Sequence, residues 1–324
     1  MSPRPALGIA LFALLVPLPL LGQAAIDPTM APRAAQLVRA GQQVQATELL
    51  GRYLATAPDD GSAWLGLGQV YQLGSRQWHR RGHRGEPDGE LLLDFAATAF
   101  DQSLRYPSDS AALLRATVEM ERGLGLIESS DWADFRSRFS FPPEALPPIV
   151  VVELGRNLVN SCPLGGVLVS TTDLEAVAVW SALFGDRTRP DLVSLLAVRY
   201  DDDGLYRQQM AQVLGMATGT PLTRGLLSVA GTRPVCLTPE AGALLSASSD
   251  WQPTRLLRIA GGSGTADSLG ELRITALLGA LLTRATPVTD EVVDVYREAG
   301  RANPSLCGSL LGPLGPVARE ACGH

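Results

Sequence analysis

The sequence contains no lysine, so every one of its 27 strongly basic residues is an arginine. This excludes a Lys-dependent Schiff base, a Walker-type phosphate loop and a Ser-Lys dyad. Histidine is scarce as well: His79 and His83 lie in one basic stretch, and His324 is the last residue. A Ser-His-Asp triad would need one of them beside a nucleophilic serine, and no Gly-x-Ser-x-Gly motif is present. These absences favour a protein that is not an enzyme and needs no cofactor.

The chain also has fewer basic than acidic residues, so its formal net charge is −6 at pH 7. An acidic chain argues against nucleic acid and anionic membrane surfaces as partners. The hydrophobic content of 46%, against 19% charged residues, is typical of packed globular domains. A length of 324 residues suffices for about two of them.

Only the N-terminus carries a long apolar run. It extends from Ala6 to Leu21, follows an arginine and ends near small residues that favour cleavage after Ala24. Two prolines and its short length argue against a retained membrane helix. We therefore predict a signal peptide at residues 1–24, no membrane span after its removal, and a secreted or periplasmic location.

Cysteine is present in four copies, an even number that favours two disulfides in an oxidising compartment. Three pairings are possible. Because Cys307 and Cys322 are close in sequence, we prefer that pair together with Cys162–Cys236. No CxxC spacing supports a metal site instead.

Residues 32–127 alternate helical periodicity with turns, and Trp64, Gly68 and Tyr71 follow a turn at Pro58. This pattern resembles the tetratricopeptide repeat, whose helix pairs stack side by side. The resemblance implies a helical repeat that binds a protein partner, with Trp64 and Tyr71 as candidate contact residues. The alternative is that these helices only support the second domain.

A basic insertion from Arg76 to Glu90 departs from the repeat pattern. His79 and His83 are four residues apart, as zinc ligands on one helix face would be. Gly82 and the surrounding arginines argue against a bound cation. We therefore expect a solvated basic loop that could dock an acidic partner.

Residues 147–265 predict an α/β domain, because short apolar runs alternate with helical segments. The candidate strands are Gly166 to Ser170 and the runs RPDLVSLLAV, RPVCLTP and TRLLRIA. Strands separated by helices imply a parallel sheet. Residues 266–324 return to helices that pack on this domain, and Thr289 is the expected cap of one of them.

Asp173, Trp180 and the step Arg189-Pro190-Asp191-Leu192 occur in this order within residues 150–260. This segment resembles the soluble C-terminal domain of a bacterial membrane-protein family of unknown function that is related to protein O-mannosyltransferases. The chain lacks the family's fuller acidic turn and its membrane-embedded part, where sugar transfer would occur. The resemblance therefore implies an α/β fold and, for function, at most accessory work beside a membrane glycosyltransferase.

The turn after the first strand predicts a helix start rather than a ligand site. Thr172 and Glu175 have the spacing of a capping box, and Asp173 adds negative charge that disfavours a bound phosphate. An alternative is a cation- or small-ligand-binding module, or a hydrolase, that uses strand-end carboxylates. The candidate ligands are Asp173, Asp201, Asp202 and Asp203, and the last three also serve as ordinary helix caps. We favour a non-catalytic scaffold protein of the cell envelope.

Overall fold

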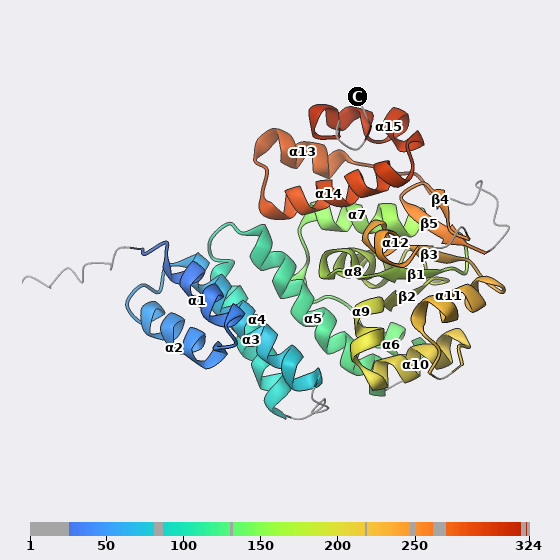
Figure 1. The fold of residues 1–324 in the computed structure, drawn as a ribbon. Helices are drawn as coiled ribbons and strands as arrows, with labels where there is room; N and C mark the ends of the chain where they lie inside the picture. The colour runs from blue at the N-terminus through green and yellow to red at the C-terminus, as the bar shows by residue number, and fades with distance from the viewer. Residues whose placement is uncertain are drawn as a thin grey trace, which may run out of the picture.

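The computed structural model describes residues 26–80, 87–129, 132–217, 219–246, 250–261, 270–318 and 322. An array of helices lies on one side of the molecule and a five-stranded sheet covered by helices on the other (Figure 1). The long helix α5 (Asp109–Ser129) lies between them. The expected class, helices followed by a domain that combines helices and strands, is confirmed at this level. Within the described ranges, no helix combines the length and the apolar character that a membrane span requires.

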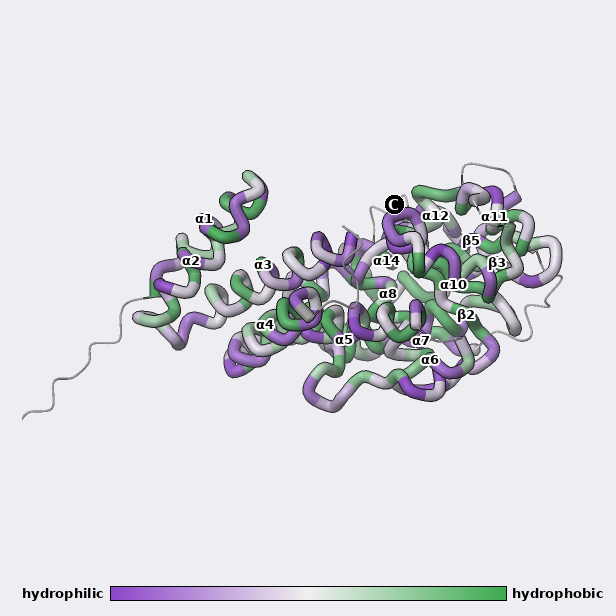
Figure 2. The backbone as a smooth tube through the Cα atoms, turned by 90° about the horizontal axis from the view of Figure 1, so that it is seen from below, coloured by the Kyte–Doolittle hydropathy of each residue, from purple (hydrophilic) through white to green (hydrophobic). Residues whose placement is uncertain are grey.

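The array is built from helices that pack against their neighbours in sequence. They are α1 (Met30–Arg39), α2 (Gln43–Leu54), α3 (Gly61–Arg80) and α4 (Pro87–Ser103), followed by α5. Hydrophobic and hydrophilic residues alternate along these helices, whereas the centre of the sheet domain is more uniformly hydrophobic (Figure 2). Gly68 permits the close approach of α3 and α4, because a Cβ atom there would lie 2.4 Å from the ring of Phe100.

The basic insertion is a correction to the sequence-based prediction. Instead of forming a solvated loop from Arg76 to Glu90, the chain continues α3 through Arg80 and begins α4 at Pro87. His79 is only 7% exposed, and Arg76 forms ion pairs with other elements. These buried contacts favour the helix over a loop. His83 lies outside the described residues.

The sheet has the strand order β2-β1-β3-β5-β4. Its strands are β1 (Val167–Ser170), β2 (Val193–Leu196), β3 (Val235–Leu237), β4 (Gln252–Thr254) and β5 (Leu257–Ala260). β2, β1 and β3 are parallel, but β5 is antiparallel to both β3 and β4. The prediction of a wholly parallel sheet is therefore wrong. A two-residue turn at Arg255 and Leu256 reverses the chain, so that β4 and β5 form a hairpin at the sheet edge.

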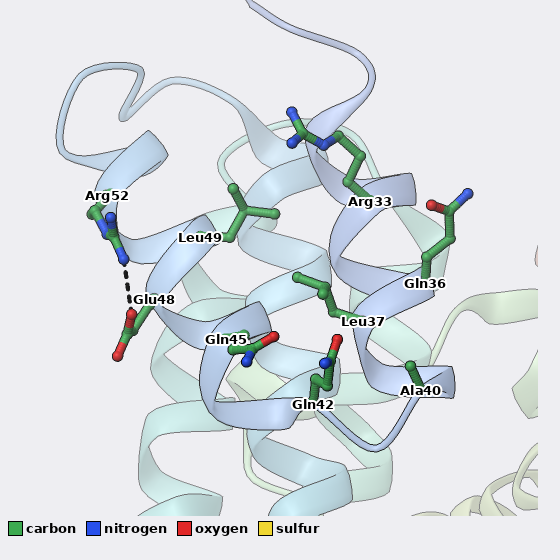
Figure 3. Close-up of a pocket in the computed structure, with 9 residues that line it drawn as sticks. All are labelled: Arg33, Gln36, Leu37, Ala40, Gln42, Gln45, Glu48, Leu49 and Arg52. Atoms are coloured by element: carbon green, nitrogen blue, oxygen red, sulfur yellow. Dashed lines mark hydrogen bonds and ion pairs between the residues drawn. The ribbon is translucent and has the colours of Figure 1, made fainter.

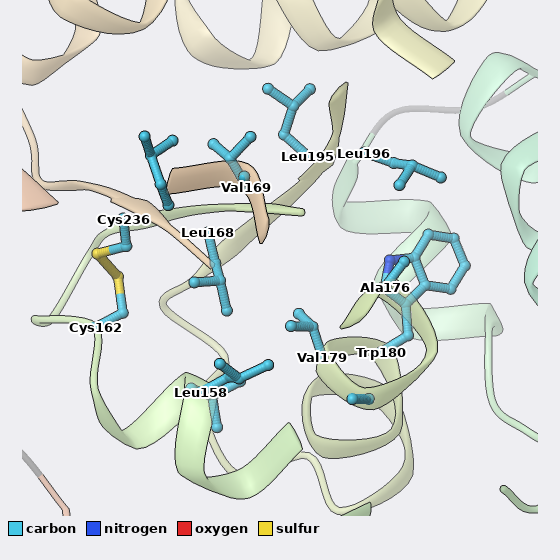
Figure 4. Packing of buried hydrophobic residues seen from close by; sticks show 14 of the residues in the cluster. Leu158, Cys162, Leu168, Val169, Ala176, Val179, Trp180, Leu195, Leu196 and Cys236 are labelled. Atoms are coloured by element: carbon cyan, nitrogen blue, oxygen red, sulfur yellow. A yellow bond between two sulfur atoms is a disulfide. The ribbon is translucent and has the colours of Figure 1, made fainter. Parts of the chain in front are cut away.

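Both faces of the parallel strands are covered. Leu168 and Cys236 are directed toward α7 (Ile149–Asn160) and α8 (Asp173–Trp180), whereas Val169 and Leu195 point to the opposite face (Figure 4). β1 and β2 are buried at every position, as expected for continuous apolar runs in parallel strands. Disulfides join Cys162 to Cys236 and Cys307 to Cys322, which is the pairing preferred from the sequence.

The remaining helices surround the sheet, with α7 and α8 on one side and α10 and α11 on the other (Figure 1). They are α6 (Trp132–Arg138), η1 (Pro143–Ala145), η2 (Ser181–Gly185), α9 (Ala197–Asp202), α10 (Gly204–Leu214), α11 (Leu222–Ala230), α12 (Pro239–Leu245), α13 (Thr275–Thr283), α14 (Pro287–Ala302), α15 (Ser305–Ser309) and η4 (Gly312–Ala318). The cap of α14 is Thr286 rather than the expected Thr289, because Pro287 starts the helix and the Thr286 hydroxyl accepts a hydrogen bond from the Thr289 amide.

Candidate functional site

The carboxyl ends of the parallel strands form the edge at which open α/β sheets bind ligands. Ser170 ends β1 beside Leu196, which ends β2, and β3 ends one position earlier in the same register. The segments that follow these strands therefore begin side by side. They contain all four strand-end aspartates that the sequence offers as ligand candidates.

Glu175 links two of these strand ends. The Thr172 hydroxyl accepts a hydrogen bond of 3.3 Å from the Glu175 amide, which confirms Thr172 as the cap of α8. The Glu175 carboxylate, however, accepts hydrogen bonds from the Thr238 hydroxyl (2.7 Å) and the Glu240 amide (3.0 Å) at the start of α12. Half of the expected capping box is therefore present, and the fully buried Glu175 side chain connects α8 to α12 instead.

The stability of the chain should depend on pH through Glu175. Burial raises the pKa of this carboxyl from 4.5 to about 7, although the hydrogen bonds from Thr238 and Glu240 oppose the rise. The folded chain thus holds the proton more tightly, so the stabilisation is present below about pH 4.5 and lost as the pH rises through about 7. We expect the free energy of unfolding to fall by about 3 kcal/mol across this window.

Urea denaturation at several pH values measures this effect. Glu175→Gln should flatten this part of the profile, because an amide does not titrate. The exposed Glu48→Gln is the matched control and should keep the wild-type profile. A wild-type pH profile in the Glu175 variant would contradict the assignment.

A buried charge cluster joins α3 to the strand ends. Glu121 of α5 is 3% exposed, and its Oε1 atom binds both Arg76 Nε at 2.7 Å and Arg199 Nη2. Arg76 Nη2 also donates to Asp173 at 2.7 Å. The two carboxylates beside Arg76 hold its pKa well above the ordinary value for an arginine, although burial alone would lower it. The acidic groups that Arg76 contacts therefore lie within the same chain.

The other strand-end aspartates have separate roles. Asp203 caps α10 by accepting hydrogen bonds from the amides of Leu205 and Tyr206. Asp202 lies 3.7 Å from Arg80, and the main-chain carbonyl of Asp201 accepts a hydrogen bond from an arginine side chain. In the part of the chain that the structure describes, no group of three His, Cys, Asp or Glu side chains is placed to hold a metal ion.

Four hydroxyl groups near this edge are buried without a hydrogen-bond partner among the described residues, those of Ser170, Thr171, Ser194 and Tyr200. Sequence reasoning identified none of them as a buried polar group. Ser194 pairs in register with Leu168, so its side chain lies on the α7–α8 face of the sheet. The alternation of side-chain directions along a strand is the only feature of the sequence that could have predicted the position of Ser194.

Two hollows lie in the helical array, at a distance from the sheet. The first, of about 580 Å³, lies between α1 and α2, where Leu37 and Leu49 are surrounded by polar side chains (Figure 3). An ion pair between Glu48 and Arg52 lies at one side of it (Figure 3). Glutamines supply most of the remaining lining, so polar side chains make up a larger share of the lining here than in the second hollow of the array.

The second hollow, which we call the α1–α3 groove, has a volume of about 410 Å³ and a mostly apolar lining. Its lining residues are Ala31, Ala34, Ala35, Val38, Arg39, Ser62, Leu65, Gly66, Gln69, Val70 and Leu73. All charged side chains of α1 and α3 are basic, although the chain as a whole is acidic. The groove therefore combines apolar walls with one charged residue among those that line it, Arg39.

Trp64 and Tyr71, the partner-binding candidates from the sequence, lie on other sides of α3. The Trp64 indole donates a hydrogen bond of 2.8 Å to the carbonyl of Pro58, in the turn between α2 and α3. Tyr71 lies against Phe95 of α4, with ring centroids 5.3 Å apart. Both side chains are half-buried, and neither lines the groove.

Comparison of this chain with family models, with curated proteins and with solved structures finds no match. The functional interpretation therefore rests on the geometry described above.

Proposed function

We propose that this chain is a non-catalytic interaction protein that binds a partner polypeptide in the α1–α3 groove. The observation that carries the proposal is the apolar lining of this groove, with Arg39 as the one charged residue among those that line it. Burial of apolar surface supplies binding free energy, and charge complementarity selects the partner. The occupant we propose is an amphipathic helix with acidic residues beside its apolar face.

The arrangement at the strand ends supports this choice of site. Asp173, Glu175 and Asp203 all bind groups of the chain itself, which holds α3, α8, α10 and α12 in place. The stacked helices also support the interpretation of the array as tetratricopeptide-like, a fold-level analogy that favours a protein partner. Two disulfides support a secreted or periplasmic location, because such bonds persist in oxidising compartments.

Groove variants of the full chain test this function. Arg39→Glu and Leu65→Arg should each weaken capture of the partner at least about 10-fold, because they reverse the charge or block the apolar wall. Arg33→Glu is the matched control: Arg33 is on the same helix but lines the α1–α2 hollow. Photocrosslinking from position 69 should identify the captured segment. Equal capture by all three variants would refute the proposal.

A further inference from the structure

We propose that a second copy of this chain occupies the α1–α3 groove, entering it with the outer face of α4. The inference rests on the proposed function, because it names one partner for the groove. Copies would then associate head to tail, each contributing its α4 to one neighbour and its groove to another. Where these two neighbours are different molecules, such a contact generates a chain or a ring.

The outer face of α4 carries exposed apolar side chains at helical spacing. Leu91 is 48% exposed and Phe95, one turn later, is 44% exposed. The contact with Tyr71 fixes the position of the Phe95 ring on the surface. Two large apolar residues at i and i+4 are the pattern with which a helix fills an apolar groove.

The charges on α4 complement those around the groove. α4 has acidic residues and no basic ones, with Asp88 and Glu90 in its first turn close to Leu91. Arg39 lines the groove, and no acidic residue is present on α1 or α3. Arg39 on the groove side and Glu90 on the α4 side therefore carry opposite charges, and attraction between them favours this pairing. Asp94, beside Phe95, is already paired with Arg122 of the same chain.

A competing apolar helix has the wrong charge. α13 contains no charged residue, and its Leu282 is 86% exposed, the largest value among the exposed hydrophobic side chains. However, α13 is followed directly by Arg284, whereas Arg273 before it is paired with Glu271. Because α13 has no acidic residue to meet Arg39 and Arg284 would oppose the contact, charge favours α4 over α13.

Self-association of the full chain tests the proposal. One helix face in a groove buries less than the roughly 1,200 Å² of a standard interface, so the association should be weak and concentration-dependent. Sedimentation velocity from about 5 to about 200 µM should show the weight-average mass rising with concentration. Phe95→Glu and Leu91→Glu should each raise the dissociation constant about 10-fold or more, and Leu282→Glu should leave it unchanged. A monomer at all concentrations, or association lost in the Leu282 variant alone, would overturn the proposal.

Charge reversal gives a second, more specific test. Glu90→Arg and Arg39→Glu should each weaken self-association, and an equimolar mixture of the two variants should restore it, because each contact then again joins opposite charges. No restoration in the mixture would overturn the pairing. Glu90→Arg should still capture a separate partner protein, since position 90 lies outside the groove. A wild-type chain that stays monomeric but still captures a partner through the groove would therefore refute only the second-copy inference. An Arg39→Glu variant whose self-association and capture both equal those of the wild type would refute both proposals.

Discussion

Replacing Glu121 by alanine is expected to lower the free energy of unfolding by about 3 to 5 kcal/mol. The variant leaves the guanidinium groups of Arg76 and Arg199 without the carboxylate that they share. The Glu121 side chain is almost inaccessible, and Arg199 is only 6% exposed, so water cannot replace the lost oxygen. Removal of one partner of a buried ion pair has this magnitude because an uncompensated charge stays in the interior.

Urea denaturation followed by circular dichroism measures this loss. Glu48→Ala is the control, because it removes an exposed ion pair with Arg52 and should change the free energy of unfolding by at most about 1 kcal/mol. If both variants lost the same small amount, the cluster would contribute no more than a surface ion pair, and its role in fixing α3 against the strand ends would be refuted.

Removal of the Cys162–Cys236 disulfide is expected to have an effect of similar size. The bond closes a loop of 74 residues between the end of α7 and β3. Loss of the cross-link enlarges the conformational freedom of the unfolded chain, which corresponds to about 4 kcal/mol for a loop of this length. Both residues are fully buried, so replacement by alanine also leaves unfilled space beside Leu158 and Leu168 (Figure 4).

The Cys162→Ala/Cys236→Ala variant should therefore unfold at a clearly lower urea concentration than the wild type. The Cys307→Ala/Cys322→Ala variant is the matched control, because its loop of 15 residues corresponds to about 3 kcal/mol. Chemical denaturation of both variants under identical conditions gives the comparison. A larger loss from the shorter loop would show that strain or local packing, rather than loop closure, dominates.

Elements specified by short stretches of sequence could be predicted well. The apolar run at Val167–Ser170 forms β1, Thr172 caps α8, and Asp203 caps α10 as expected for a residue just before a helix. These features depend on residues a few positions apart. The antiparallel direction of β5 could not be predicted in this way. β5 follows β4 through the hairpin turn at Arg255, and β4 has no apolar periodicity from which a strand could be predicted.

Apart from the Cys162–Cys236 disulfide, the contacts between distant segments could not be predicted. Arg76 and Asp173 are 97 residues apart, and nothing in the basic stretch indicates that its first arginine is buried against a strand-end aspartate. Glu175 has the spacing of a capping box, but Thr238 and Glu240 lie more than 60 residues further along the chain. The spacing of residues within a segment predicts which of its side chains can contact one another. It gives no information about which distant segments pack against them.

The α1–α3 groove was missed for a different reason. The repeat resemblance drew attention to Trp64 and Tyr71, which are large and easily recognised. The residues that line the groove are smaller, and Leu65, Gly66 and Gln69 form a second side of α3 at spacings of three and four residues. Since α3 carries apolar residues on several sides, the sequence did contain a signal that this helix has more than one neighbour.

Helix α5 belongs to both parts of the molecule, because it packs against α4 in the array and against α8, α10 and α14 beside the sheet. Its 21 residues correspond to a rod roughly 30 Å long. A polypeptide bound between α1 and α3, as proposed, would therefore be connected to the sheet domain through α3, α4 and this continuous helix. Under the proposed function, the array would present its partner on one side of the sheet domain, because α5 packs against both parts.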